Sequence, residues 1–123
     1  MGKITRNYIQ RNPEVLFVFG DNDQRWGKGG MAAEFRDEPN ALGVRTKKYP
    51  GTQDKHYYTD DEYEDNCGKI EEDIDRIREV FRSYALIVVP EGIGKGRAEL
   101  RKRAPETYEF LMDQLRNLRK LQK

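Results

Sequence analysis

Two short apolar runs stand out in the pattern of hydrophobic and polar positions along the chain. The runs 15–19 and 85–89 contain no polar residue, which is typical of strands that are buried on both faces of a parallel sheet. A third strand is expected over 41–46, where Gly43 weakens the pattern. The sequence therefore predicts a small sheet with buried central strands.

Apolar residues also recur with helical spacing in two longer segments. From residue 67 to about residue 83 they follow the i, i+3, i+4, i+7 pattern of an amphipathic helix. A second stripe begins at Tyr108, behind Pro105, which suits the first position of a helix. Short helices are expected at 4–9, where an edge strand is the alternative, and at 31–36.

Polar segments separate these elements and predict turns and loops. Residues 20–22 (Gly-Asp-Asn) follow the first apolar run directly and have the composition of a turn. The segment 47–61 has the polar character of a loop, with a possible short strand at 56–58. Thr59 and Glu62 have the spacing of a capping box before the first long helix.

The alternation of apolar strands, glycine-rich loops and helices indicates an α/β protein. We expect a small three-layer sandwich with buried central strands and helices on both faces of the sheet. The length of 123 residues supports one domain over 1–123. In open α/β sheets, ligands bind beyond the carboxyl ends of the strands, and both glycine-rich loops leave from such ends.

Composition excludes several classes of protein. No run approaches the ~18 consecutive apolar residues of a membrane helix, and residues 1–10 lack the apolar stretch of a signal peptide, so a cytoplasmic protein without a membrane segment is expected. One cysteine, Cys67, and one histidine, His56, cannot form a disulfide or a zinc site of the usual kind. We expect no metal and no cofactor, and Cys67 on the apolar stripe fits the core.

Charge is unevenly distributed although the net charge is only +1. Residues 54–75 contain ten acids against two lysines, whereas residues 95–103 carry a net charge of +4 and residues 25–48 a net charge of +3. Both basic stretches adjoin glycine clusters. This pattern favours a small phosphate-bearing ligand over an extended nucleic acid, with ordinary solvated charge as the alternative.

Seven of the 11 glycines lie in two segments, which we call the first glycine loop (residues 20–30) and the second glycine loop (residues 90–97). Glycine allows positive φ and close approach to a ligand, and free backbone N–H groups before a helix form an anion site. Neither loop has the spacing of a P-loop or of a dinucleotide fingerprint. The predicted ligand-binding residues are Gly20, Asp21, Asn22, Arg25, Trp26, Gly27, Lys28, Gly29, Gly30, Thr46, Gly92, Ile93, Gly94, Lys95, Gly96 and Arg97.

Several of these residues have a structural alternative. Taken singly, each glycine can simply make a tight turn, and turn chemistry also explains Asp21 and Asn22. Trp26, the only tryptophan, suits stacking on a base or packing against its own loop. Lys47 follows a strand end, where it could contact phosphate, act as a nucleophile or remain solvated.

The loop motifs carry a resemblance that covers nearly the whole chain. Residues 19–22 are Phe-Gly-Asp-Asn and residues 27–30 are Gly-Lys-Gly-Gly, with Arg25 between them and Ala32 after them. Residues 90–96 follow the pattern Pro-x-Gly-Ile-Gly-x-Gly. With these motifs the chain resembles an uncharacterised family of short bacterial and phage proteins. This resemblance implies no activity.

A more distant resemblance implies a function. Macrodomains have a strand ending in an asparagine-containing turn, a glycine-rich stretch that opens a helix, and a later strand followed by a Gly-x-Gly loop. Asn22, residues 27–35 and residues 90–96 are similar to these elements. The resemblance implies a macrodomain-like fold and an ADP-ribose-type ligand.

The most similar macrodomain class removes ADP-ribose from protein or DNA with a lysine and an acid that act together, the lysine attacking the anomeric carbon. Thr46-Lys47 is similar to the lysine element, while Ala98 stands near the place of the acid and Glu99 is next to it. By this resemblance the catalytic residues are Lys47 with Asp21 or Glu99.

Three functions remain open from the sequence. The first is binding of an ADP-ribose-type nucleotide with N- or O-glycosidic hydrolysis, and the second is a non-catalytic nucleotide reader or sponge. The third is an interaction protein that uses an acidic helix over 60–83, in which Glu71, Glu72, Asp73 and Asp75 would contact a basic partner. The oligomeric state is open.

Overall fold

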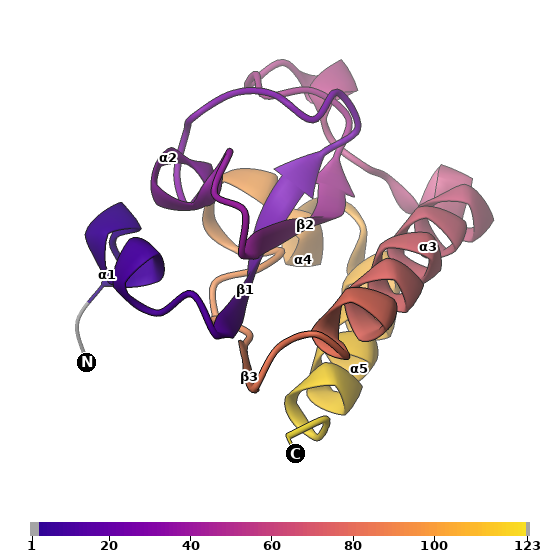
Figure 1. Cartoon of the computed structure of the whole chain (residues 1–123). Helices are drawn as coiled ribbons and strands as arrows, with labels where there is room; N and C mark the ends of the chain where they lie inside the picture. Colours follow the sequence, from indigo (N-terminus) through magenta and orange to yellow (C-terminus); the bar gives the residue numbers. More distant parts are fainter. Residues whose placement is uncertain (1–2, 123) are drawn as a thin grey trace.

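A three-stranded parallel sheet forms the centre of the protein in a computed structural model, which describes residues 3–122. Strand β1 (Val15–Asn22) lies between β2 (Ala41–Lys47) and β3 (Leu86–Val88) (Figure 1). The chain is thus a mixed α/β domain, as the sequence predicts.

The unalternating apolar run of β1 is explained by two cores, one on each face of the sheet. Val15, Phe17 and Phe19 point into one cluster, whereas Leu16 and Val18 point into the other. Because successive side chains of a strand point to opposite faces, covering both faces of β1 buries every position of its apolar run.

Helices cover both faces. The short helices α1 (Arg6–Arg11) and α2 (Ala32–Phe35) pack on the Phe17 face, and the long helices α3 (Tyr63–Phe81) and α5 (Pro105–Arg119) pack on the other face. The four helices expected from the sequence are confirmed with shifted ends. Pro105 occupies the first turn of α5, as predicted, and Cys67 is buried on α3.

The remaining helical segments are short. Helix α4 (Leu100–Arg103) follows the second glycine loop, and three 3₁₀ helices lie at Asp54–His56, Asp60–Glu62 and Gly96–Ala98. Within the part of the chain that the structure describes, no helix is both long and apolar enough to span a membrane.

The predicted turn at residues 20–22 is wrong, because β1 continues through Asn22. Gly20 pairs with Val44 and Asp21 with Arg45, and a register shift then places Asn22 beside Lys47. Asp21 and Asn22 are buried, and side chains of neighbouring arginines and backbone groups satisfy their polar atoms. Turn-forming residues can therefore end a buried strand when partners from distant segments satisfy them.

The segment 85–89 is also less buried than its composition predicts. Only Leu86–Val88 form β3, an edge strand that pairs with the start of β1, and Leu86 is 48% exposed. An apolar strand buried on both faces is correct for β1 and wrong for β3.

Two expectations for the segment 47–61 are wrong as well. Tyr57 makes only an isolated antiparallel bridge with Lys47, so no strand forms at 56–58. The side chain of Thr59 makes no capping hydrogen bond, and Glu62 pairs instead with Lys48. A capping box requires both reciprocal bonds, which the spacing alone does not ensure.

Candidate functional site

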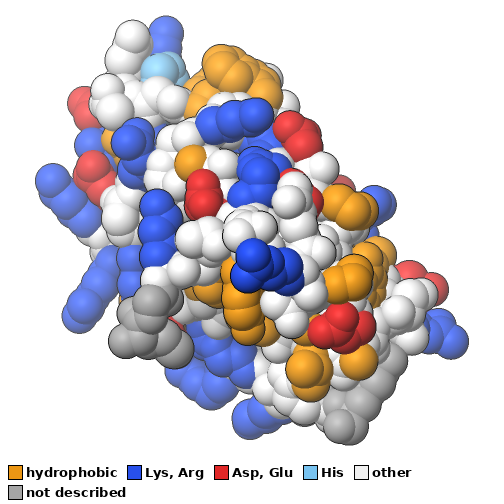
Figure 2. Space-filling view, turned by 60° about the vertical axis from the view of Figure 1, so that its left-hand side comes forward, with side chains coloured by type: hydrophobic (Ala, Val, Ile, Leu, Met, Phe, Trp, Pro, Cys, Tyr) orange, Lys and Arg blue, Asp and Glu red, His pale blue; other side chains and the backbone are white. Residues whose placement is uncertain are grey.

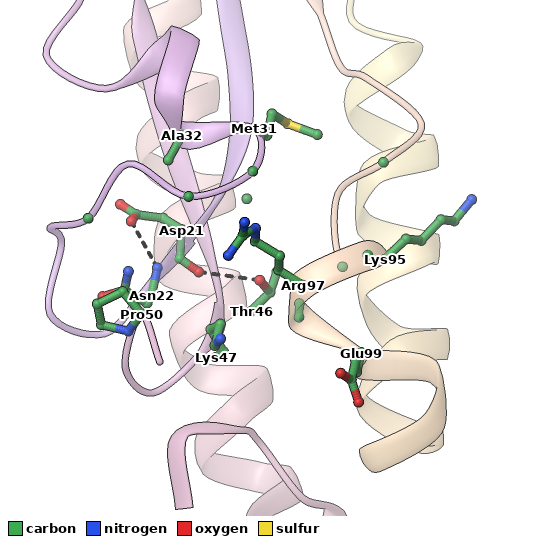
Figure 3. Close-up of a pocket in the computed structure, with 18 of the residues that line it drawn as sticks. Asp21, Asn22, Met31, Ala32, Thr46, Lys47, Pro50, Lys95, Arg97 and Glu99 are labelled. Atoms are coloured by element: carbon green, nitrogen blue, oxygen red, sulfur yellow. Dashed lines mark hydrogen bonds between the residues drawn. The ribbon is translucent and has the colours of Figure 1, made fainter. Parts of the chain in front are cut away.

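A cleft of about 380 Å³ opens at the carboxyl ends of β1 and β2, between the two glycine loops (Figure 3). This volume lies in the range of small-molecule sites. The position agrees with the rule that parallel sheets bind ligands beyond the carboxyl ends of their strands. The two loops therefore converge on one site, which sequence spacing could not establish.

The two loops come into close contact at Gly29 and Gly30. The side chain of Arg97, from the second loop, lies along the backbone of Gly29 and Gly30 in the first loop. A Cβ atom added at Gly29 would lie 3.1 Å from Nη1 of Arg97, and one added at Gly30 would lie 3.0 Å from Cδ. These glycines give the arginine a flat surface across the mouth of the cleft.

The second loop is fixed from below by the core. Gly94 has a φ of +83°, and a Cβ atom there would lie 2.6 Å from Cδ2 of Leu111. Ile93 is 1% exposed and belongs to the main core. Gly94 thus lets the loop turn directly over helix α5.

Most of the predicted site residues share this cleft. Those that line it are Gly20, Asp21, Asn22, Gly27, Gly29, Gly30, Thr46, Lys47, Gly92, Gly94, Lys95, Gly96, Arg97 and Glu99. Arg25, Trp26, Lys28 and Ile93 do not belong to its lining. Trp26 is 61% exposed, so it packs little against its own loop.

The cleft also contains residues that the sequence analysis did not select. They are Met31, Ala32, Arg36, Pro50, Gly51, Thr52, Tyr57 and Ala98. The segment 50–57 has neither periodicity nor a motif, so no sequence signal placed it beside the glycine loops. The bridge between Lys47 and Tyr57 brings it there.

Lys47 is a buried cation of the cleft. Its Nζ donates a hydrogen bond of 2.6 Å to the carbonyl oxygen of Gly51 and lies 4.5 Å from the centre of the Tyr57 ring. Burial lowers the pKa of Lys47, and the positive charges of Arg97 and Arg103 lower it further, against the opposing charge of Glu99. A lysine with a lowered pKa is more often neutral, and a neutral amine is nucleophilic.

Glu99 lies in the same cleft, in a left-handed conformation with a φ of +45°. Its carboxylate accepts a hydrogen bond of 3.0 Å from Nε of Arg103. Arg103 in turn lies 3.7 Å above the centre of the Tyr57 ring. Lys47 and Glu99 therefore share one wall of the cleft, linked through Tyr57 and Arg103.

Asp21 is occupied by structural contacts. Its carboxylate accepts hydrogen bonds from the guanidinium groups of Arg36 and Arg25 and from the backbone N–H of Asn22. Of the two acids expected to act with Lys47, Glu99 is the one whose charge acts on the Lys47 pKa.

The lining of the cleft is positively charged overall, with four basic and two acidic residues. Arg36 is neutralised by Asp21. Among residues 3–122, the guanidinium of Arg97 and the ammonium of Lys95 form no hydrogen bond or ion pair, and Figure 3 shows Arg97 directed across the cleft and Lys95 directed away from it. Figure 2 shows further Lys and Arg side chains spread over one face of the molecule. This arrangement favours an anionic ligand.

Comparison with known proteins adds a family but no activity. A family model described as a family of unknown function (DUF7831) matches residues 1–114. Neither the curated proteins nor the solved structures gave a significant match.

Proposed function

For this chain, which belongs to the family of unknown function DUF7831, we propose binding of an ADP-ribose-type nucleotide in the cleft, with hydrolysis of an N- or O-glycosidic ADP-ribosyl bond. The observation that carries the proposal is the convergence of two glycine loops and the unpaired guanidinium of Arg97 at the carboxyl edge of the sheet. Backbone N–H groups and a guanidinium are suited to hold a diphosphate between them.

The layers of the fold support the likeness to macrodomains. A parallel sheet with helices on both faces and glycine loops after β1 and β3 is the order of elements that this likeness requires. Three strands make a smaller sheet than a macrodomain has, which agrees with the short chain.

In the proposed reaction Lys47 is the nucleophile. Its neutral amine donates its electron pair to the anomeric carbon, a C–N bond forms, and the glycosidic bond breaks with its electrons going to the leaving group. The nitrogen of Lys47 then carries an extra proton, which the carboxylate of Glu99 can take up and pass to the leaving group. Water then hydrolyses the bond to Lys47 and releases the sugar, restoring the amine.

The test is a comparison of Lys47→Ala with the wild type on an ADP-ribosylated protein and an ADP-ribosylated oligonucleotide. We expect Lys47→Ala to abolish the release of ADP-ribose and to retain its binding, measured by calorimetry. Lys48→Ala is the matched control, because the neighbouring Lys48 does not belong to the lining of the cleft and pairs with Glu62. Unchanged release by Lys47→Ala would exclude Lys47 as the nucleophile.

A non-catalytic reader or sponge is the second candidate, favoured by the contacts of the two reactive groups. The ammonium of Lys47 donates to the Gly51 carbonyl, and the carboxylate of Glu99 accepts from Arg103. Ligand recovered intact after long incubation, with calorimetric binding preserved, supports this reading. Conversion of the ligand, detected by mass spectrometry, contradicts it.

The third candidate, an interaction protein that binds a basic partner through the acids of α3, has less support, because one of these four acids is buried. Asp73, expected on the contact surface, is 3% exposed and pairs with arginines inside the protein. Glu71, Glu72 and Asp75 remain exposed on α3. Reversing the charge of these three tests a basic partner without disturbing the interior.

A further inference from the structure

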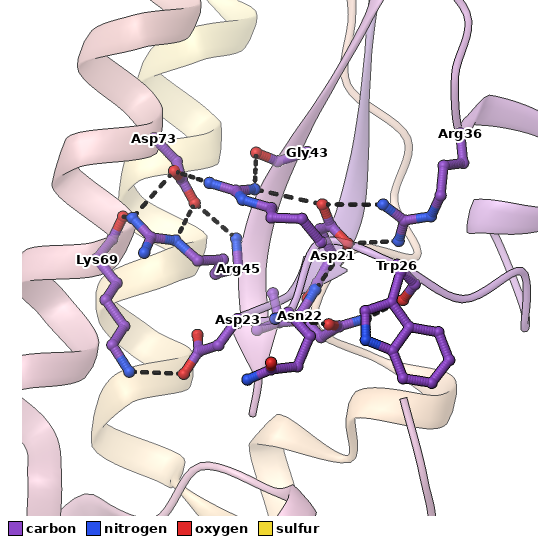
Figure 4. Close-up of polar contacts among 12 residues, drawn as sticks. Asp21, Asn22, Asp23, Trp26, Arg36, Gly43, Arg45, Lys69 and Asp73 are labelled. Atoms are coloured by element: carbon purple, nitrogen blue, oxygen red, sulfur yellow. Dashed lines mark hydrogen bonds and ion pairs between the residues drawn. The ribbon is translucent and has the colours of Figure 1, made fainter. Parts of the chain in front are cut away.

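The first glycine loop is held from the side that faces away from the cleft. Arg25, in the left-handed conformation with a φ of +60°, bonds through its guanidinium to Asp73 of helix α3, and Figure 4 shows its acceptors Asp21, Gly43 and Asp73 grouped beside the loop. The guanidinium donates to Oδ1 of Asp73 at 2.6 Å, to the carbonyl oxygen of Gly43 at 3.2 Å and to Oδ2 of Asp21 at 3.3 Å. One side chain thus joins the loop to both neighbouring strands and to α3.

Asp73 is the residue of α3 to which Arg25 is bound. It lies in the middle of α3, is 3% exposed, and accepts hydrogen bonds from the backbone N–H of Arg45, the side chain of Arg45 and the side chain of Arg25. A buried carboxylate is tolerated only when it is paired and hydrogen-bonded. Its position in a long helix makes it a rigid anchor.

The same loop has further attachments, among them Asp23, whose carboxylate accepts hydrogen bonds from Lys69 of α3 at 2.7 Å and from the hydroxyl of Tyr58 at 2.6 Å. Nε of Arg36 donates a hydrogen bond of 2.6 Å to the carbonyl oxygen of Gly27. The side chain of Asn22 donates to the carbonyl oxygen of Trp26 and accepts from the backbone N–H of Gln24. The backbone from residue 22 to residue 27 is therefore held by several polar contacts, and Gly27 also packs closely against Pro50.

We infer that Arg25 and Asp73 are positioning residues, which hold the first glycine loop in the shape that binds the ligand. Arg25 does not line the cleft, and its guanidinium is committed to Asp73, Gly43 and Asp21. A glycine-rich loop without this attachment must be ordered when the ligand binds, and that ordering lowers the affinity. The inference rests on the proposed function for the identity of the ligand.

Arg45 offers a matched control. It donates to the same carboxylate of Asp73 and is more buried than Arg25, with side-chain exposures of 15% and 42%. The side chain of Arg45 makes no hydrogen bond to the first glycine loop among residues 3–122. Arg25→Met and Arg45→Met therefore both remove an arginine from Asp73, but only Arg25→Met releases the loop.

The experiment measures two properties of both variants. The first is amide hydrogen exchange of residues 23–30 in the free protein, and the second is the dissociation constant of ADP-ribose. We expect faster exchange of these amides and about tenfold weaker binding in Arg25→Met, with both near wild type in Arg45→Met. Arg25→Lys should recover part of the affinity, because it keeps the charge but cannot reach three partners at once.

Equal exchange of the loop amides in Arg25→Met and in the wild type overturns the inference, and so does an equal loss of affinity in both variants. Absence of ADP-ribose binding by the wild type contradicts the proposed function instead, and the exchange comparison still decides whether Arg25 holds the loop. If Arg25→Met does not fold, Asp73→Asn takes its place: it keeps the shape of the side chain and weakens the bonds to both Arg25 and Arg45, so that its difference from Arg45→Met reports the bond to Arg25.

Discussion

The two glycine loops frame one cleft but are held by different forces. The first loop is attached by a buried network of charged side chains, in which Arg25 and Arg36 connect it to Asp21 and Asp73. The second loop is attached by apolar contacts, with Ile93 in the core and Gly94 against Leu111. Charge networks depend on geometry and pairing, whereas apolar contacts depend on volume. Substitutions should therefore affect the two loops by different routes.

The largest effect is expected from Asp73→Ala, which removes the anchor of the first loop. It leaves the guanidinium groups of Arg45 and Arg25 without their buried partner, and losing one member of a buried ion pair costs about 3–5 kcal/mol. Urea unfolding measures the loss of stability. Glu72→Ala is the control, since Glu72 also pairs with Arg45 but is exposed, and it should cost less than about 1 kcal/mol. Equal costs would contradict a buried network.

Gly94→Ala tests the apolar attachment of the second loop and should be the next largest effect. The new Cβ would meet Leu111 at 2.6 Å in a backbone conformation that alanine avoids, so a loss of about 2–3 kcal/mol is expected. Thermal unfolding measures it. Gly68→Ala on α3 is the control, because a Cβ there meets nothing within 4 Å, and it should stabilise by about 0.5–1 kcal/mol. A neutral Gly94→Ala would mean that the second loop can shift away from α5.

Arg97→Met sharpens the comparison at the point where the loops meet. Because the positive charge of Arg97 lowers the pKa of Lys47, removing Arg97 should raise this pKa. The neutral amine of Lys47 then forms at higher pH. The rate of reductive methylation of Lys47, followed against pH, measures the shift. Because the charge of Arg97 is exposed, the difference should shrink in high salt. An unchanged profile would show that Arg97 does not contribute to the lowered pKa of Lys47.

The lowered pKa of Lys47 also affects stability, in a defined direction. Between the folded pKa and the ordinary value of a free lysine, the unfolded chain binds more protons, so stability rises as the pH rises through this window. In Lys47→Met this contribution is absent. Unfolding experiments below and within the window should show a smaller gain in stability for Lys47→Met than for the wild type.

Trp26→Ala is expected to have the smallest effect. Its ring is 61% exposed and does not line the cleft, and only its backbone takes part in the first loop through Asn22. Stability should change by less than about 0.5 kcal/mol, and the affinity for ADP-ribose by less than about twofold. A large loss of affinity with unchanged stability would show that the ring stacks on the ligand.

The same contrast explains how much the sequence could predict. Apolar periodicity located α3, α5 and β1, because their burial follows directly from the spacing of apolar residues. It misjudged Asp21 and Asp73, which have turn and surface composition but are buried by arginines from distant segments. Pairing between residues 48 positions apart, such as Arg25 and Asp73, leaves no local signal.

The candidate site was also predictable only in part, because the sequence shows the residues within one segment but not those that other segments bring to it. The glycine clusters and Lys47 were visible because the motif and the strand end lie next to each other in the chain. Tyr57 and Arg36 were missed, since they reach the cleft through a bridge to β2 and through the pairing of Arg36 with Asp21. The local sequence identified the residues of each glycine loop, but not the residues of other segments that face them across the cleft.

The contact of Arg97 with Gly29 and Gly30 has an evolutionary consequence. A Cβ atom at either glycine would come within 3.0–3.1 Å of the arginine, whose side chain would have to shift, so the two positions are coupled to a residue of the other loop as well as to their own turn. Within the family, we expect a larger residue at position 29 or 30 only in sequences where position 97 has become shorter. An alignment of family members would reveal this as covariation between two loops that are distant in the chain.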